Sequence, residues 1–390
     1  MTQRTCWGVT GVFLAMAMGC SSSSSSTATE SDGGQPDAPS NSVDGGGTLD
    51  QILTESMFNA AFPNKLDRYR HTDLIAAATK YFPTFGTEGT SDQRRREVAA
   101  FLAHKIVETQ GLGWNQGDLA VAGGLMQYEE LNARTAGVAW HHYREADVTY
   151  PPYGPEDGTI PVGSKADGGS GVYILPPDRT VRNQPGVKRT YIGRGPIQVS
   201  YNYNYGQFSA WYFGERANAI PTWFTGLYTD GATIQAGQVL VRDPDIMLDP
   251  GNEEMLWASA LWFWMTAQPP KPSPHDVMVG RWVPSTGDVT AGRTADRPFA
   301  VTTDIVNGGV ECSGVSCGGN IPVCYPSSAI SNTSVVGPPR GTPGVERGWA
   351  KLQTWGRGIA YSRFCAVLTT QPLSTEVALD DRVCGDMRPY

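Results

Sequence analysis

The sequence predicts a mainly α-helical protein with long connecting loops. Apolar residues recur at spacings of three and four in several stretches, most clearly over 98–106, as on one face of a helix. A second stretch, 253–266, is apolar on almost every side, which is typical of a buried helix. Few stretches alternate apolar and polar residues as half-buried strands do. Helices and loops, with little sheet, are therefore expected.

Length and composition narrow the class of protein further. The chain has 390 residues, enough for one large domain or two ordinary ones. A net charge of −8 and a pI near 5.2 argue against nucleic acid as the partner, because phosphate binding needs a basic face. Only 17% of residues are charged, while 46 Gly, 28 Pro, 11 Trp and 16 Tyr suit a loop-rich extracellular protein. No linker-like break follows residue 48, so we expect one domain over 49–390. The protein is also expected to be a monomer.

The first 19 residues are typical of an export signal. Arg4 gives a positive start, an apolar run follows over 9–18, and Ala17 to Cys20 resemble a bacterial lipoprotein cleavage site. The apolar run is too short to span a bilayer as a helix. We expect Cys20 to carry lipid at the outer membrane or cell surface, with ordinary secretion as the alternative. Residues 20–48 are rich in Ser, Gly, Asp and Pro and should form a disordered tether.

Three helices are expected next. Two lie within 49–81; the first is ended by Pro63 and the second is stopped by Pro83. The third is long, and Ser91 or Asp92 should cap it.

Acidic residues stand at and beyond the end of this long helix. Glu108 lies close to the glycines that stop the helix, and Glu129 and Glu130 follow a glycine-spaced loop. Two carboxylates are the raw material for general acid–base chemistry. The chain has 38 Asp and Glu residues, however, so taken alone these three are better explained as solvated surface charges.

The middle of the chain is loop-rich and polar. Residues 133–190 are rich in Gly, Pro and Tyr and predict a long loop region that forms a binding wall or a lid. Residues 211–241 are interpreted as an insertion. Between them, over 190–208, amide and hydroxyl side chains alternate with apolar and aromatic ones. This pattern fits either sugar recognition or an ordinary strand or helix start.

The C-terminal third predicts two more helices. A short one over 301–306 ends at Asn307, with Glu311 just beyond it, and a last one over about 345–368 carries Arg347. Five cysteines lie in this third, enough for two bridges with one left over in an oxidising compartment. They lack histidines and CxxC spacing, so neither a metal nor another cofactor is implied.

Four stretches together resemble family 19 glycoside hydrolases, the plant-type chitinases also found in bacteria. They are REVAAFLAHKIVETQG, YIGRGPIQVSYNYNYG, ALWFWMTAQPPKPSPHDVM and VTTDIVNGGVEC. The resemblance covers the chain from about residue 49 to the C-terminus. It implies a lysozyme-like, two-lobed helical domain with a substrate cleft.

The resemblance also implies roles for the carboxylates. The family inverts configuration: one Glu protonates the leaving oxygen, and a second carboxylate activates a water on the opposite sugar face. Glu108 matches the acid. Glu130 matches the base, because it lies 22 positions later and is followed by Leu131-Asn132, as in bacterial members. Glu129 is then a solvated neighbour.

Further residues match positions of the family's site. Ser200 matches the serine that holds the nucleophilic water, and Glu311 with Arg347 matches an ion pair behind the acid. Residues at sugar-lining positions are Gln198, Tyr203, Asn204, Lys271 and Asn307. The implied disulfide is Cys312–Cys384, with Cys317–Cys324 as a local extra bridge and Cys365 buried and free.

The implied function is that of an exported endochitinase acting on chitin or N-acetylglucosamine oligosaccharides. The sequence departs from the family at Val107, where His is usual, and in a longer turn before Trp114. Two alternatives therefore stay open. One is a muramidase-like hydrolase of peptidoglycan, and the other is a non-catalytic carbohydrate-binding lipoprotein of the same fold.

Overall fold

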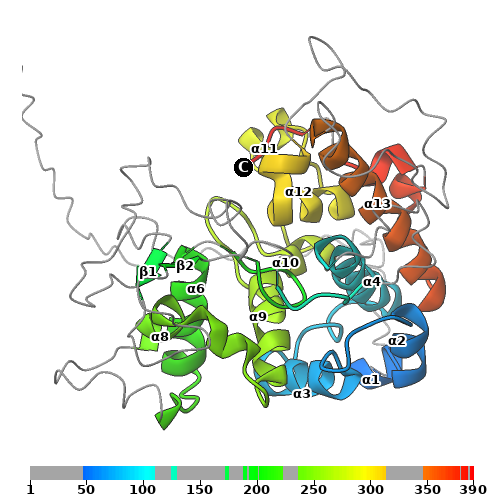
Figure 1. Ribbon diagram of the computed structural model, residues 1–390. Coiled ribbons are helices and arrows are strands. Elements are labelled where there is room, and N and C mark those ends of the chain that lie inside the picture. Colours follow the sequence, from blue (N-terminus) through cyan, green and yellow to red (C-terminus); the bar gives the residue numbers. More distant parts are fainter. Residues whose placement is uncertain are drawn as a thin grey trace, which may run out of the picture. The chain divides into compact units, whose positions relative to one another are not determined.

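Helices form nearly all the regular structure of the described chain (Figure 1). The computed structural model describes residues 47–109, 124–129, 172–174, 188–190, 193–200, 202–222, 236–312, 346–377, 379–384 and 387–390. Within these residues the only sheet is a two-stranded ribbon. The prediction of a mainly α fold is confirmed.

The elements follow one another in this order along the chain. The α-helices are α1 (Leu49–Ile52), α2 (Glu55–Ala61), α3 (His71–Tyr81), α4 (Ser91–Glu108), α6 (Asn202–Ser209), α8 (Val239–Arg242), α9 (Glu253–Met265), α10 (Pro274–Met278), α11 (Thr286–Thr290), α12 (Pro298–Glu311) and α13 (Glu346–Val367). The π-helix η2 is Ala210–Glu215, and the 3-10 helices are η3 (Ala236–Gln238), η4 (Pro244–Leu248), η6 (Ser374–Glu376) and η7 (Leu379–Arg382). Strands β1 (Val172–Ile174) and β2 (Lys188–Thr190) are antiparallel, with Val172 opposite Thr190.

The first expected helix is two helices, α1 and α2. The chain breaks at Leu53, whose side chain is fully buried, and restarts at Thr54. The Thr54 side chain accepts the backbone N–H of Met57 and so caps α2. A local capping side chain thus overrides the continuous apolar pattern of this stretch.

The long helix α4 is capped one residue earlier than predicted. Thr90, not Ser91 or Asp92, is the N-cap: its hydroxyl accepts the N–H of Gln93. The Gln93 side chain in turn accepts the N–H of Thr90 at 2.8 Å. This reciprocal capping box fixes the start of α4, and its other end carries Glu108.

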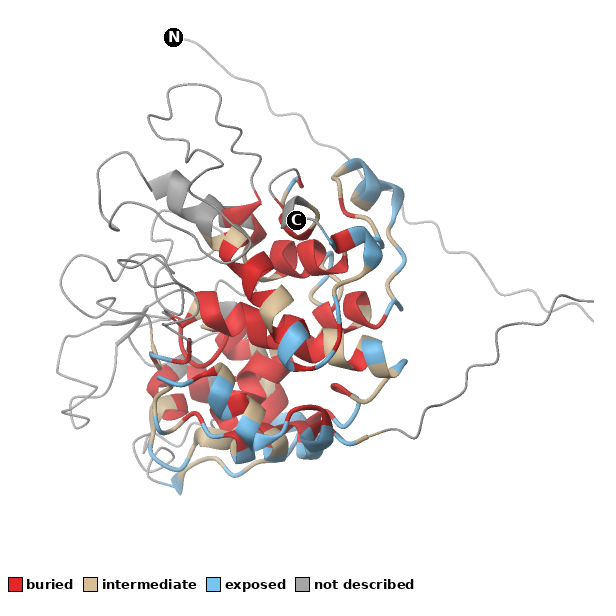
Figure 2. Cartoon of the chain, turned by 90° about the vertical axis from the view of Figure 1, so that its right-hand side faces the viewer, coloured by how far each residue is buried: buried red, intermediate tan, exposed pale blue. Residues whose placement is uncertain are grey.

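Helix α4 packs along α13, while α9 packs on α3, and α12 contacts both α10 and α13. Buried residues gather where these helices meet, and exposed residues lie toward the outside (Figure 2). None of the helices in the described part of the chain is long and apolar enough to cross a membrane.

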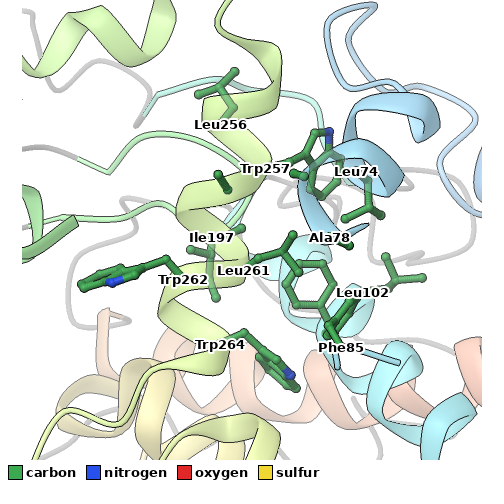
Figure 3. Close-up of a cluster of buried hydrophobic side chains, with 14 of the residues drawn as sticks. Leu74, Ala78, Phe85, Leu102, Ile197, Leu256, Trp257, Leu261, Trp262 and Trp264 are labelled. Atoms are coloured by element: carbon green, nitrogen blue, oxygen red, sulfur yellow. The ribbon is translucent and has the colours of Figure 1, made fainter. Parts of the chain in front are cut away.

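Helix α9 is buried on all sides, as its sequence predicts. Trp257, Trp262 and Trp264 are at most 2% exposed. Figure 3 shows Trp257 and Leu261 directed toward α3, whereas Trp262 points the other way. The tryptophans are therefore core residues. They hold together the helices that surround the candidate site.

Helix α12 is longer than its sequence predicts. It begins at Pro298 and continues to Glu311, although a stop was expected at Asn307. Asn307 instead has non-helical angles, φ −147° and ψ 30°, so the expected end is a kink inside the helix. The kink places Asn307 and Glu311 on separate turns of one element.

A buried carboxylate joins α4 to α9 and α10. Glu97 of α4 is fully buried and accepts N–H groups from Trp264 at 3.1 Å, Gly86 at 3.0 Å and His275 at 2.5 Å. The other ring nitrogen of His275 lies 3.2 Å from Glu88. Burial alone would lower the pKa of His275, but the hydrogen bond and the charge of Glu97 outweigh it and raise the pKa.

Because of His275, we predict that the free energy of unfolding depends on pH. Because its folded-state pKa is raised, its contribution is complete below the ordinary value of 6.5 and is lost as pH rises through the raised pKa. His275→Leu leaves the buried Glu97 without an opposite charge, so we expect the free energy of unfolding to fall by about 3–5 kcal/mol near pH 6, and by less near pH 8. Urea denaturation at both pH values measures this. An equal loss at the two pH values would contradict the ion pair.

Candidate active site

Glu108 is the last residue of α4, and Thr109 closes the helix behind it. Thr109 takes non-helical angles, and its hydroxyl donates to the carbonyl of Lys105. The same hydroxyl accepts the backbone N–H of Leu125 at 2.5 Å. The Glu108 side chain is 16% exposed, although the helix around it is buried. Its carboxyl group is therefore fixed by the fold yet open to a ligand.

A single arginine, Arg357 of α13, holds the Glu108 carboxyl group. Arg357 Nη2 donates to Glu108 Oε1 at 2.5 Å and to Glu311 Oε1 at 2.7 Å. Its Nε donates to Glu311 Oε2 at 2.9 Å, so the contact with Glu311 is bidentate. The side chains of Arg357 and Glu311 are 0% exposed. One buried guanidinium thus faces two carboxylates, and only Glu108 reaches solvent.

The arginine of this ion pair differs from the one expected. The resemblance pointed to Arg347, but the structure places Arg357 beside Glu311. Both arginines belong to α13, and ten residues of helix separate them by about 15 Å. Spacings of three and four connect positions 347 and 357 on one stripe, so the sequence alone does not say which turn faces Glu311. The side chain of Arg347 lies outside the described residues.

The surroundings raise the pKa of Glu108 above its ordinary value. Burial is the largest cause, the positive charge of Arg357 opposes it, and the negative charge of Glu311 adds to it. Glu108 consequently keeps its proton to higher pH than an exposed glutamic acid. This is the property that a general acid requires.

A buried lysine lies one turn before Glu108 on α4. Lys105 is 0% exposed, and its Nζ has no hydrogen-bond partner among the described residues. The Nζ sits 3.8 Å from the centre of the Phe101 ring. Burial lowers the pKa of Lys105 well below its ordinary value, while the Glu108 charge raises it. Neither Lys105 nor Arg357 was predicted as a site residue. A basic residue three positions before Glu108 was the available sequence signal for Lys105.

The segment 124–129 is tied to the end of α4. Met126 N–H donates to Thr109 O at 3.2 Å, and the Gln127 amide donates to Glu108 O at 2.9 Å. Gly124 has a φ of +73°, and a Cβ there would lie 2.9 Å from Cα of Ile106, so only glycine allows this approach. The chain therefore runs from beside Glu108 to Glu129, the residue before Glu130. Glu130 itself lies outside the described residues.

The motif around Gln198 meets this segment. Glu129 and Arg194 form a β-bridge, and Gly195 N–H donates to Tyr128 O at 2.8 Å. Gln198 has a φ of +51°, and its amide donates to Gly195 O at 2.8 Å. Its side-chain oxygen is buried without a partner among the described residues. The fold thus brings the Gln198 motif next to the stretch leading to Glu130.

Asn204 lies one helical turn beyond Ser200. Its amide donates to Ser200 O at 2.9 Å, and its own oxygen is buried and unpartnered within the described chain. The side chain of Tyr203 lies outside the described residues. Two of the predicted sugar-lining amides, Gln198 and Asn204, therefore each have an acceptor oxygen without a partner among the described residues.

Asn307 and Lys271 lie at the kink of α12. The Asn307 amide donates to Glu311 Oε1 at 2.8 Å, which joins it to the carboxylates held by Arg357. Lys271 Nζ donates to Ile305 O at 2.8 Å. The structure thus links Glu108, Glu311 and Asn307 directly. Lys271 is linked to the same stretch of α12, because Ile305, whose carbonyl it binds, lies two positions before Asn307.

A disulfide joins the end of α12 to the C-terminal segment. Cys312 and Cys384 are bonded, with Cα atoms 4.9 Å apart, immediately after Glu311. Cys365 is buried and has no disulfide. These findings agree with the pairing that the resemblance implies, whereas the Cys317–Cys324 bridge lies outside the described residues.

A helical domain with a partly exposed carboxylic acid at the end of a buried helix has the features of a lysozyme-like glycoside hydrolase. The family described as chitinase class I, glycoside hydrolase family 19, matches residues 47–151 and 209–320, more than half of the chain. The chain belongs to this family.

Three similar proteins illustrate the relationship. A basic endochitinase of Vitis vinifera is 34% identical over 68% of this chain and 65% of its own length. An endochitinase of Avena sativa is 35% identical over 68% of this chain and 86% of its own length. A relative named inactive chitinase-like protein 1, from Hevea brasiliensis, is 32% identical over 71% of this chain and 69% of its own length.

The ion pair of Arg357 predicts a large effect on stability. Arg357→Leu leaves the buried Glu311 without an opposite charge, so we expect the free energy of unfolding to fall by about 3–5 kcal/mol. Adding Glu311→Leu removes the orphaned charge and should recover a large part of the loss. Denaturant unfolding of the single and double variants measures both effects. A double variant no more stable than Arg357→Leu would contradict this account.

Proposed function

We propose that the chain is an endo-acting chitinase that hydrolyses β-1,4 bonds between N-acetylglucosamine units with inversion of configuration. One observation carries the proposal. Glu108 combines a raised pKa, partial exposure and a fixed position on Arg357, in the motif where the family has its acid.

In this proposal Glu108 protonates the glycosidic oxygen as the bond to the sugar breaks. When the proton leaves, Glu108 becomes a carboxylate, and the positive charge of Arg357 beside it stabilises this negative charge. Glu130 acts as the general base, removing a proton from the water that attacks the opposite face of the sugar. Ser200 holds this water. The attachment of 124–129 to α4 supports the pairing, because it leads the chain from Glu108 toward Glu130.

The proposed sugar contacts come from Gln198, Tyr203, Asn204, Lys271 and Asn307. Sugar hydroxyls donate hydrogen bonds, and buried oxygens without partners are costly unless a ligand satisfies them. The buried oxygens of Gln198 and Asn204 have no partner in the described part of the chain, which supports a role as acceptors for such hydroxyls. The proposed substrate is a chitin chain or an N-acetylglucosamine oligosaccharide.

The first test is the stereochemistry of the products from N-acetylglucosamine oligomers, followed by NMR. We expect release of the α-anomer, and a loss of rate of about 10²–10⁴-fold in both Glu108→Gln and Glu130→Gln. Glu129→Gln is the matched control and should keep most of the activity. The wild-type rate should fall as pH rises through the raised pKa of Glu108, since the acid must carry its proton. A β-anomer, or an active Glu108→Gln variant, would overturn the mechanism.

A second candidate is a non-catalytic carbohydrate-binding protein. Val107 favours it, because it removes a polar side chain next to the acid. The same assay separates the two: binding of chitin oligomers without turnover would support the second candidate. Purified peptidoglycan serves as the alternative substrate, and release of reducing ends from it alone would identify a muramidase.

The protein is also proposed to be exported and anchored by lipid at Cys20. The basic start, the short apolar run and the cleavage-site motif support this proposal. Cys20→Ala should abolish incorporation of radiolabelled fatty acid and move the protein from the membrane fraction to the soluble exported fraction. Equal membrane association of both forms would exclude the anchor and leave ordinary secretion.

A further inference from the structure

A histidine outside the predicted site touches the arginine that holds the acid. His104 lies on α4, one turn before Glu108, and is 0% exposed. Its ring stacks on Phe299 of α12, with centroids 5.2 Å apart and planes 20° apart. Nδ1 lies 3.0 Å from Nη1 of Arg357, and Nε2 lies 3.0 Å from the hydroxyl of Thr302.

These partners determine the protonation of His104. A guanidinium only donates hydrogen bonds, so Nδ1 has to be an acceptor and carries no proton. Nε2 then carries the proton and donates to Thr302 Oγ1, and the Thr302 hydroxyl itself donates a hydrogen bond to Phe299 O at 2.7 Å. Burial, and the nearby charges of Arg357 and Lys105, lower the pKa of His104 well below its ordinary value. The ring is therefore neutral, with one defined tautomer.

This contact completes the hydrogen bonding of Arg357. The guanidinium has five N–H groups. Three go to Glu311 and Glu108 through Nε and Nη2. The two on Nη1 go to Nδ1 of His104 at 3.0 Å and to the His104 carbonyl at 3.4 Å. Without the imidazole, Nη1 would keep only the 3.4 Å contact with the carbonyl of residue 104. The Nη1 side of the guanidinium would then be held less firmly.

We propose that His104 is a positioning residue of the acid: by accepting an N–H of Arg357 it fixes the plane of the guanidinium, so that Nη2 stays directed at Glu108. The role rests on the proposed function, because it concerns the same acid. The charged groups that act on the ring are Arg357 on α13 and Lys105 on α4. Glu311 on α12 and Glu108 on α4 act on Arg357. The neutral ring thus links Thr302 on α12 to Arg357, and the charged Arg357 in turn contacts the acid.

A purely structural role is the competing explanation, since the ring also fills space between Phe299 and Trp264. The two explanations differ in what removal of Nδ1 changes. A space-filling ring affects stability alone. A positioning ring affects how strongly Arg357 favours the Glu108 carboxylate, and therefore the pH at which Glu108 titrates.

The test compares variants that keep or lose the acceptor. His104→Leu removes it, and His104→Asn offers an amide oxygen near the position of Nδ1. His71→Leu is the matched control: His71 is also a buried histidine of the core, bonded to Leu53 O at 2.6 Å on the separate helix α3. The readouts are the pH profile of kcat and the titration of the Glu108 carboxyl carbon by ¹³C NMR, assigned by its absence in Glu108→Gln.

We expect His104→Leu to move the Glu108 titration and the alkaline limb of the profile to higher pH, because Arg357 then stabilises the carboxylate less. It should also lower kcat by up to about 100-fold through misplacement of the acid. His104→Asn should lie between His104→Leu and wild type, and His71→Leu should lose stability without moving the titration. If His104→Leu does not fold, Thr302→Val frees the tautomer of His104 and should shift the titration in the same direction by less.

A Glu108 titration equal to wild type in folded His104→Leu, or in both His104→Asn and Thr302→Val, would overturn the proposal. The titration of Glu108 by NMR does not require the protein to cleave a substrate. If the wild type does not cleave chitin oligomers, the proposed function fails while the titration still decides whether His104 positions Arg357.

Discussion

The site depends on one buried cation, the guanidinium of Arg357. It is withdrawn from water and faces Glu311 and Glu108, so its desolvation has to be offset by its hydrogen bonds. Glu311, whose side chain is fully buried, holds it through two hydrogen bonds. Glu108, partly exposed, is left as the carboxyl group whose proton can be exchanged with a ligand. The different roles of the two carboxylates follow from their different exposure.

The fold is arranged so that these three side chains meet. Helix α4 delivers Glu108, α12 delivers Glu311 and α13 delivers Arg357. The packing of α4 and of α12 against α13 holds the three helices together, and the Cys312–Cys384 bridge fixes the end of α12 to the C-terminal segment. The buried helix α9 supports α4 through Trp264 and Glu97. The tryptophan-rich core therefore serves the site indirectly, by leaving the acid little freedom to move.

Local sequence was sufficient for some of this arrangement and insufficient for the rest. Helix α4 and the buried helix α9 follow from apolar spacing, and Glu108 at a helix end follows from the glycines after it. The break between α1 and α2 depends on a cap at Thr54, which the apolar pattern conceals. Arg357 could not be chosen over Arg347, because both lie on one helical stripe and the choice depends on where α13 crosses α12. The contact of His104 with Arg357 joins residues 253 positions apart, which no local pattern reveals.

The central claim is that Glu108, held by Arg357, is the acid that meets the glycosidic oxygen. A crystal structure of Glu108→Gln with an N-acetylglucosamine tetramer tests it most directly. We predict a glycosidic oxygen within hydrogen-bond distance of the residue 108 amide, with the Glu130 carboxylate on the opposite face of the sugar, about 6.5–9.5 Å from it. A tetramer bound away from residue 108, or Glu130 on the same face as residue 108, would contradict the account.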